Sequence, residues 1–89
     1  MSWEVISPPA HWFDKPRPEI LNIRLQSRAD VYEVCQRATG KADQFGCAIV
    51  WPDKCDVYIA DDLPQMLRDQ VQIHEVGHCH GWPGNHPVN

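Results

Sequence analysis

The sequence has no excess of basic residues, no long apolar run and no recognisable targeting segment. Its 8 lysine and arginine residues are outnumbered by 12 aspartate and glutamate residues, which gives a formal net charge of −4. A dedicated nucleic-acid-binding protein would show a basic surface, so we expect no nucleic-acid partner. No stretch is long and apolar enough to span a membrane, and no basic segment followed by an apolar run opens the chain. We therefore expect a cytoplasmic protein that does not bind membranes.

No two cysteines have the Cys-x-x-Cys spacing of a zinc ribbon, which argues against a structural zinc site built from thiolates. Because we expect a reducing compartment, the cysteines should be free thiols. Oxidation would allow three pairings, and the sequence does not choose among them. The four cysteines are Cys35, Cys47, Cys55 and Cys79.

The chain of 89 residues is long enough for one domain with a thin hydrophobic core. We predict a single domain over residues 1–89, to which a bound metal would add useful stability. Prolines and aromatic residues crowd residues 1–19. This composition predicts an extended arm held in place by buried aromatic side chains, rather than a regular element. Within the arm, residues 3–6 fit a short strand.

Three segments have the patterns of β-strands. Residues 19–26 alternate apolar and polar side chains, as a half-buried strand does. Residues 46–51 and residues 56–60 are rich in β-branched and aromatic side chains. Pro52-Asp53-Lys54 lies between them and supplies turn residues, so this pair predicts a hairpin.

Two segments carry apolar residues at helical spacing, residues 28–38 and residues 63–79. Ser27 and Asp62 precede them as predicted N-caps, and Gly40 lies where the first helix should end. The order of elements is strand, helix, strand, strand, helix. This order predicts an α+β fold, with a small mixed sheet of about three strands packed on two helices.

The last predicted helix contains the segment His74-Glu75-Val76-Gly77-His78. His74 and His78 differ by about 40° around a helix, so both imidazoles lie on one face and can bind one metal ion. Glu75 is rotated by about 100° from His74, where it can accept a proton from a metal-bound water. The apolar residues of this helix fall on the same arc as the two histidines, which predicts that the imidazoles point inward: Leu63, Met66, Leu67, Val71 and Ile73.

A tetrahedral zinc site with an open position needs a third protein ligand. Gly81 ends the helix just beyond His78, and a chain that reverses there can bring His86 back over the metal. We predict His86 as the third ligand, with Asp61, Asp62 or a water as alternatives. Asn85 or a backbone carbonyl would orient one of the imidazoles.

The pattern His74-Glu75-x-x-His78-x-x-Gly81 resembles that of the zincin metallopeptidases, and its glycine resembles the metzincin branch. Metzincins place their third ligand three residues after this glycine, at the position of Gly84, whereas His86 lies two residues further on. No methionine follows the motif to form a Met-turn. The chain is therefore most similar to minimal zincin-like proteins, including those of phages and bacteria. The similarity covers roughly residues 44–86.

This resemblance implies a zinc-dependent hydrolase, a metallopeptidase in which Glu75 is the general base. Its zinc ligands would be His74 and His78, with His86 as a displaced third ligand. A peptide or protein would be the substrate. The family also implies that the substrate pairs as an added strand with the strand nearest the cleft, for which Val57-Tyr58-Ile59 is the candidate.

A second function from a different class is a catalytically inactive, zinc-stabilised module that binds a protein partner. Glu75 favours the enzyme, because a purely structural zinc site needs no base. His74 and His78 are alternatively ordinary half-buried histidines that bind backbone groups. Tyr32 and Tyr58 either pack in the core or stabilise an oxyanion.

Overall fold

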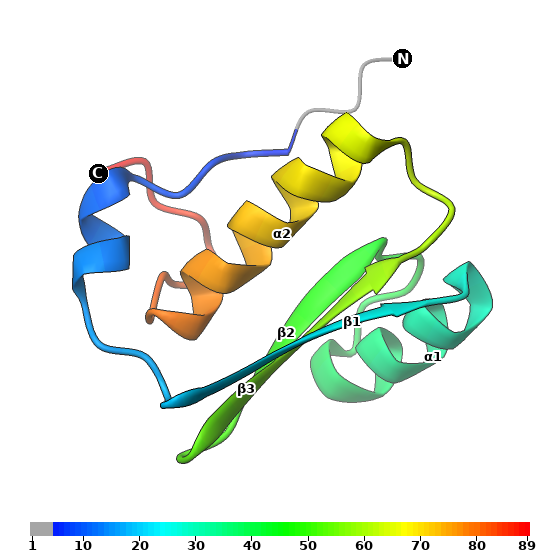
Figure 1. Ribbon diagram of the computed structural model, residues 1–89, viewed down its shortest axis with the longest axis horizontal. Coiled ribbons are helices and arrows are strands. Elements are labelled where there is room, and N and C mark those ends of the chain that lie inside the picture. The colour runs from blue at the N-terminus through cyan, green and yellow to red at the C-terminus, as the bar shows by residue number, and fades with distance from the viewer. Residues whose placement is uncertain (1–4) are drawn as a thin grey trace.

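The computed structural model describes residues 5–89. Their elements confirm the predicted α+β class, with two helices and a three-stranded mixed sheet (Figure 1). No helix in this range has both the length and the apolar character needed to cross a bilayer. In chain order the elements are η1 (Ala10–Asp14), β1 (Ile20–Gln26), α1 (Arg28–Thr39), β2 (Gly46–Val50), β3 (Lys54–Ala60) and α2 (Gln65–Cys79).

The sheet has the strand order β1-β3-β2, with β1 parallel and β2 antiparallel to β3. Val57 of β3 is therefore paired on both sides, with Ile23 of β1 and Ala48 of β2. The expectation that Val57-Tyr58-Ile59 is the strand open to substrate is wrong. Its nearly continuous run of buried residues suits the centre of a sheet, and β2 is the edge strand beside α2.

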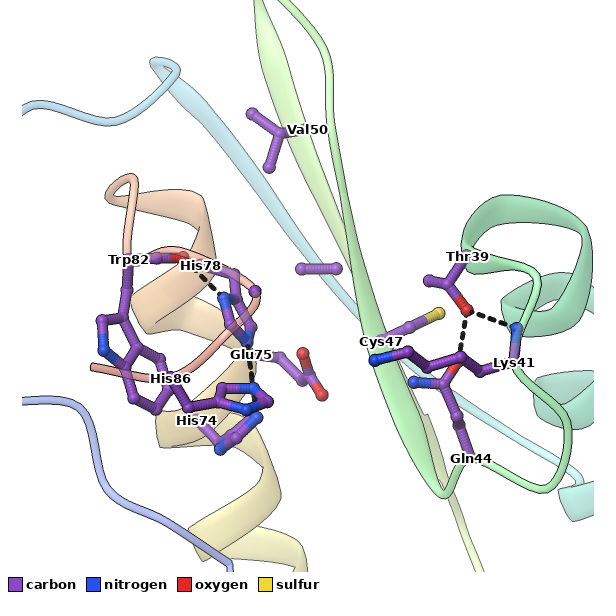
Figure 2. A pocket seen from close by; sticks show the side chains of 12 residues that line it. Thr39, Lys41, Gln44, Cys47, Val50, His74, Glu75, His78, Trp82 and His86 are labelled. Atoms are coloured by element: carbon purple, nitrogen blue, oxygen red, sulfur yellow. Dashed lines mark hydrogen bonds between the residues drawn. The ribbon is translucent and has the colours of Figure 1, made fainter. Parts of the chain in front are cut away.

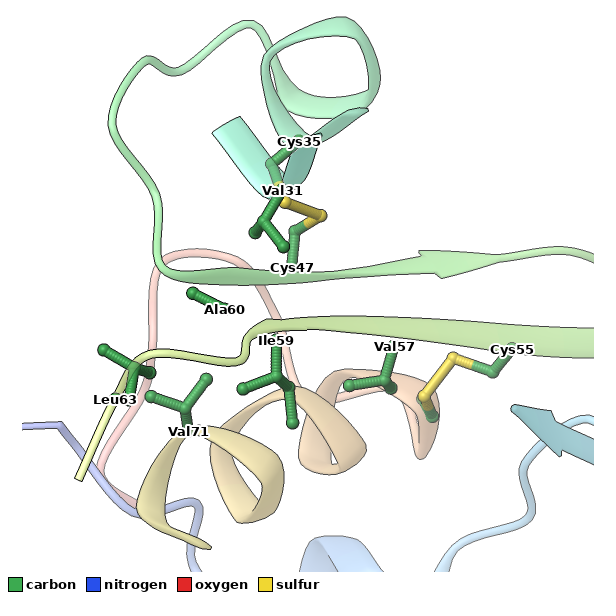
Figure 3. Close-up of a cluster of buried hydrophobic side chains, with 10 residues drawn as sticks. Val31, Cys35, Cys47, Cys55, Val57, Ile59, Ala60, Leu63 and Val71 are labelled. Carbon is green, nitrogen blue, oxygen red and sulfur yellow. A yellow bond between two sulfur atoms is a disulfide. The ribbon is translucent and has the colours of Figure 1, made fainter. Parts of the chain in front are cut away.

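The two helices lie on opposite faces of the sheet, and both pack on β2 and β3 (Figure 3). One disulfide, Cys35–Cys47, joins α1 to β2, and the other, Cys55–Cys79, joins β3 to the end of α2. The expectation of free thiols is therefore wrong, since all four cysteines are paired. The pairing follows from which helix covers which face of the sheet, a long-range property. The disulfides form part of the core, together with Val31, Val57, Ile59, Ala60, Leu63 and Val71.

The ends of α1 match the prediction. The Ser27 hydroxyl accepts a hydrogen bond from the Asp30 backbone N–H over 3.2 Å, which satisfies one unpaired donor of the first turn. Gly40 ends the helix with φ +78°, a conformation that costs glycine little. The chain is thereby turned out of α1 into the loop that leads to β2.

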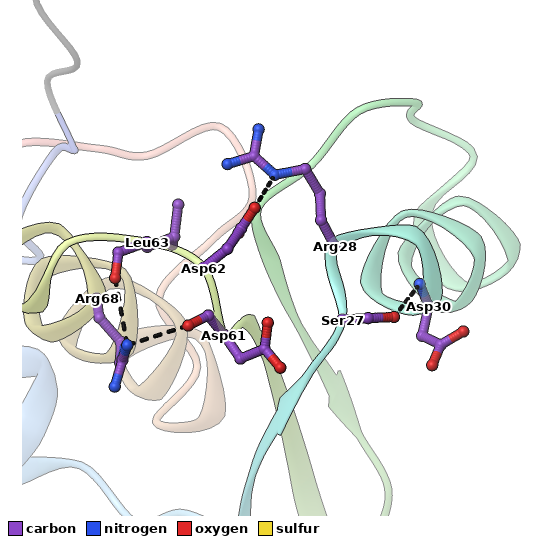
Figure 4. Close-up of polar contacts among 7 residues, drawn as sticks. All are labelled: Ser27, Arg28, Asp30, Asp61, Asp62, Leu63 and Arg68. Carbon is purple, nitrogen blue, oxygen red and sulfur yellow. Dashed lines mark hydrogen bonds and ion pairs between the residues drawn. The ribbon is translucent and has the colours of Figure 1, made fainter.

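The start of α2 differs from the prediction (Figure 4). The helix begins at Gln65, directly after Pro64, and no side chain caps it. Asp62, the predicted cap, instead pairs with Arg28 of α1 over 2.9 Å. Arg68 donates hydrogen bonds to the backbone oxygens of the connection before the helix. These contacts tie the first turn of α2 to the end of β3, and so set where the helix runs across the sheet.

The N-terminal arm runs beside α2, on the side away from the sheet (Figure 1). It is not wholly irregular, because η1 forms a short 3-10 helix. Pro8 is buried against Gly77 of α2. Of the strand expected at residues 3–6, Val5 and Ile6 are not in a strand, and the remainder lies outside the described residues.

Candidate metal centre

His74 and His78 lie one turn apart on α2, and their imidazoles converge. The two Nε2 atoms are 3.3 Å apart, and the rings meet edge to face at a centroid distance of 5.0 Å. Both side chains are half-buried. The helical spacing alone accounts for this convergence, because it places both histidines on one face.

Backbone carbonyls fix the orientation of both rings. Nδ1 of His74 lies 2.7 Å from the Ile6 oxygen, and Nδ1 of His78 lies 2.7 Å from the Trp82 oxygen. A carbonyl can only accept a hydrogen bond, so each Nδ1 carries the proton and donates it. In the neutral rings both Nε2 atoms are therefore unprotonated and face each other with their lone pairs, as in histidines that bind a metal.

The tail after α2 brings a third imidazole to the same place. Gly81 turns the chain with φ +95°, and the Trp82 N–H then donates to the Gly77 oxygen over 3.1 Å. Nε2 of His86 lies 3.2 Å from Nε2 of His78. One nitrogen of each of the three histidines lies within 4.8 Å of the others. The structure thus brings together His74, His78 and His86, the predicted ligand set.

Trp82 forms the floor of this cluster and was not identified from the sequence. Only 2% of its surface is exposed, and its ring lies 5.0, 4.9 and 4.9 Å from those of His74, His78 and His86. Its indole N–H donates to the Pro87 oxygen over 2.9 Å, which holds the tail in place. A large aromatic residue directly after the helix-ending glycine was the signal available in the sequence.

Two of the three separations between the imidazole nitrogens are those expected around a tetrahedral metal ion. Tetrahedral zinc with bonds of about 2.0–2.1 Å separates its nitrogen ligands by roughly 3.3 Å. The separations at His78 are 3.3 and 3.2 Å. Burial lowers the pKa of His78, and His74, His86 and Lys41 lower it further against the opposing effect of the Trp82 carbonyl. Burial and neighbouring positive charge also lower the pKa of His86. Both rings therefore favour the neutral form that binds a metal.

Glu75 points from α2 into a cavity of about 450 Å³, next to the histidines (Figure 2). Only 8% of the residue is exposed, and its carboxylate, which has no hydrogen-bond partner among the described residues, is open to the cavity. Burial raises its pKa to about 7 from the ordinary value of 4.5. A buried carboxyl poised near neutrality is well suited to accept and return a proton.

The other candidates lie elsewhere. Asp61 and Asp62 belong to the connection before α2 and do not join the histidine cluster. Neither Tyr32 nor Tyr58 lines the cavity. His80 points to the arm instead, where its Nδ1 lies 2.6 Å from the Lys15 oxygen. The remaining walls come from the edge strand β2 and from the loop between α1 and β2.

Comparison with protein families, curated proteins and solved structures finds no match to this chain. Any functional inference therefore depends on the chemistry of the cluster itself. Three histidines could hold a metal ion there, and a buried carboxyl faces the same cavity.

Proposed function

We propose that this protein is a zinc-dependent hydrolase of the zincin type that cleaves peptide bonds. His74, His78 and His86 hold the zinc ion, and Glu75 is the general base. The observation that carries the proposal is the convergence of three imidazole nitrogens beside a buried carboxyl that has no hydrogen-bond partner among residues 5–89. This carboxyl faces the cavity, where it can meet a bound water, and a purely structural metal site gains nothing from such a group.

Each part of the site has a separate chemical task. Zinc held by the three histidines would act as a Lewis acid and would supply a water acidic enough to lose a proton near neutral pH. Glu75 takes the proton that the attacking water loses and returns it to the amine that leaves. Trp82 and the two carbonyls hold the imidazoles in place, so that the ligands need not reorganise.

The edge strand β2 gives a peptide a place to bind. Cys47, Ala48 and Val50 line the cavity that Glu75 and the histidines share. One edge of β2 pairs with β3, and no strand of the described residues covers its other edge. An extended peptide can add to such an edge through its backbone, which would lay it across the site. In this proposal β2 takes the role that the resemblance assigned to β3.

A second candidate is an inactive module that uses the metal only for folding. The observation that favours this candidate is that the three ligands come from two parts of the chain. His74 and His78 belong to α2, whereas His86 lies in a tail that has no regular structure. A metal ion there would fasten the tail to the helix, which is valuable in a domain with a small core.

The substitution Glu75→Gln separates the two candidates. Oxidised protein is loaded with one equivalent of zinc and tested on a library of quenched fluorescent peptides. Wild type should hydrolyse some members, and Glu75→Gln should reduce the rate by about 100-fold or more while its zinc content stays the same. Glu33→Gln, an exposed change on α1, is the control and should keep the rate. Bound zinc without hydrolysis by wild type would favour the module, and an unchanged rate in Glu75→Gln would refute the role of Glu75.

We also infer an oxidising compartment in place of the expected cytoplasm. Two buried disulfides in a small domain are typical of proteins that fold where thiols are oxidised. Alkylation of the native protein, taken from its source without reductant, should then modify no cysteine. Modification of all four would restore the cytoplasmic expectation.

A further inference from the structure

The Lys41 ammonium has no ion-pair, hydrogen-bond or ring partner in the part of the chain that the structure describes. The chain has eight lysine and arginine residues. Seven of them contact a carboxylate, a backbone oxygen or an aromatic ring: Lys15, Arg17, Arg24, Arg28, Arg37, Lys54 and Arg68. The Lys41 ammonium has no such contact within residues 5–89. An ammonium group left free in an acidic protein is available for an anionic ligand.

Lys41 lies in the loop between α1 and β2 and lines the cavity of the candidate metal centre. Figure 2 shows its side chain extending across the cavity towards the side that holds Glu75. Apart from the histidines, Lys41 and Glu75 are the two ionisable side chains among the lining residues that carry a charge.

Hydrogen bonds and a disulfide hold the loop that carries Lys41 in place. The Thr39 hydroxyl donates to the Gln44 side-chain oxygen over 2.6 Å and accepts the Lys41 backbone N–H over 3.2 Å. The disulfide Cys35–Cys47 closes the same loop from α1 to β2. Lys41 is therefore presented from a constrained backbone, although its own side chain is exposed.

We propose that Lys41 is a specificity residue that binds a carboxylate of the substrate. The inference rests on the proposed function and names its substrate class, peptides that present a carboxylate to this end of the cavity. The carboxylate belongs either to the C-terminus of the peptide or to an acidic side chain, since both offer the same two oxygen acceptors. Lys41 faces the metal centre from the opposite wall, so its role is to position the substrate rather than to exchange protons.

The charge balance supports an anionic substrate. The whole chain carries −4, whereas a cavity with zinc, Lys41 and ionised Glu75 carries +2. A positive cavity in a negative molecule attracts anions selectively to that one place. An ammonium group bound to a carboxylate forms a charge-assisted hydrogen bond, which is stronger than a neutral one.

Binding is measured apart from hydrolysis, in zinc-loaded Glu75→Gln protein. The probes are two matched pairs of acetylated peptides: Ala-Ala-Ala with a free or an amidated C-terminus, and amidated Ala-Glu-Ala or Ala-Gln-Ala. Calorimetry should show that one carboxylate peptide binds about tenfold more tightly than its neutral partner. The pair that shows the preference identifies the source of the carboxylate. When Lys41→Gln is combined with Glu75→Gln, the preference should disappear, whereas Lys41→Arg in the same protein should retain it. High salt should weaken the preference.

Lys15→Gln is the matched control, because it removes a lysine from the arm, outside the cavity, and should leave the preference intact. The proposal would be overturned if neither carboxylate peptide bound more tightly than its neutral partner, or if the preference survived Lys41→Gln. It would also be overturned if none of the four peptides bound at millimolar concentration. If wild type hydrolysed peptides but Lys41→Gln changed neither binding nor rate, only the role of Lys41 would be refuted. If the preference depended on Lys41 but the protein hydrolysed no peptide, only the peptidase activity would be refuted.

Discussion

Pro8 of the N-terminal arm packs directly on Gly77 of α2, where the helix has no Cβ to hold the arm away. A Cβ at Gly77 would lie 2.9 Å from Pro8 Cβ, closer still to Pro8 Cγ, and 3.3 Å from Trp82 Cε3. Two residues before Pro8, the Ile6 oxygen accepts the hydrogen bond that orients His74. A glycine between the two histidines of the motif therefore lets the arm reach the metal centre.

Gly77→Ala tests this relationship. Alanine in place of glycine inside a helix normally adds about 1 kcal/mol to stability. Here the new methyl group would displace Pro8, and overpacking of this kind costs about 1–3 kcal/mol. We expect the clash to prevail, so that the free energy of unfolding falls and zinc binds more weakly. Urea denaturation and zinc titration measure the two effects.

Gly84→Ala is the control for this experiment. Gly84 has nothing within 4 Å of an added Cβ and a φ that alanine accepts. Its stability should stay within about 0.5 kcal/mol of wild type. If Gly77→Ala were instead more stable than wild type, the arm would not be packed on α2 as described.

Local patterns of the sequence were enough to predict most elements and the two helical histidines. The convergence of His74 and His78 depends only on helical spacing, which is a local property. The same reasoning failed in detail for the buried arc of α2, because Met66 and Ile73 are 75% and 49% exposed. Whether an apolar residue is buried depends on what packs against it, and among the described residues nothing buries these two side chains.

Features that depend on long-range contacts could not be predicted from the sequence. The carbonyl of Ile6 and the ammonium of Lys41 reach the site from segments that are far from His74 in the sequence. Strand order has the same origin, since the position of β3 between β1 and β2 depends on a parallel pairing that no hairpin signal reveals. The disulfides follow from that order, so their pairing could not be predicted before the topology was known.

Zinc should stabilise the protein through His86. At a zinc concentration a hundredfold above Kd, the free energy of unfolding should rise by about 2.7 kcal/mol, and Tm by roughly 10 °C or more. His86→Ala removes one ligand and should weaken zinc binding by about 100-fold or more. Competition with a chromogenic chelator gives the affinity, and thermal denaturation with and without zinc gives the stabilisation.

His11→Ala provides the comparison for His86→Ala. His11 lies against Trp12 in η1, outside the cluster, and its loss should change neither the zinc affinity nor the effect of zinc on Tm. Equal zinc affinities in wild type and His86→Ala would show that His86 is not a ligand. The third position would then have to be filled from elsewhere.

Asp56 should make the fold sensitive to acid. Burial alone would raise the pKa of this carboxyl, but a hydrogen bond from Asn22 and the charges of Lys54 and Arg24 hold it below its ordinary value of 3.8. The Asn22 amide donates over 2.9 Å, and both cations lie within 3.7 Å. The folded state releases this proton more readily than the unfolded state. Its stabilising effect is therefore complete above pH 3.8 and is lost as the pH falls through the folded pKa.

Asp56→Asn tests the acid sensitivity. The variant should be less stable than wild type near pH 7, by about 1 kcal/mol, because the neutral amide no longer attracts the two cations. The difference should shrink as the pH is lowered through the range below 3.8. Urea denaturation at a series of pH values measures it. A difference that stays constant down to pH 2 would show that Asp56 does not titrate in this way.

Glu75 should have the opposite effect in protein kept free of metal by a chelator. Its pKa is about 7 in the folded state and ordinarily 4.5, so between these values the folded state keeps a proton that the unfolded state releases. The free energy of unfolding should therefore fall as the pH rises from 4.5 to 7, by up to about 3 kcal/mol.

Glu75→Gln tests this pH dependence, because it replaces the carboxyl with a side chain that is neutral at every pH. This variant should then be more stable than wild type near pH 8 and nearly equal to it near pH 4.5, as urea denaturation can measure. A variant that is no more stable than wild type near pH 8 would mean that the carboxylate is well solvated and that burial does not raise its pKa.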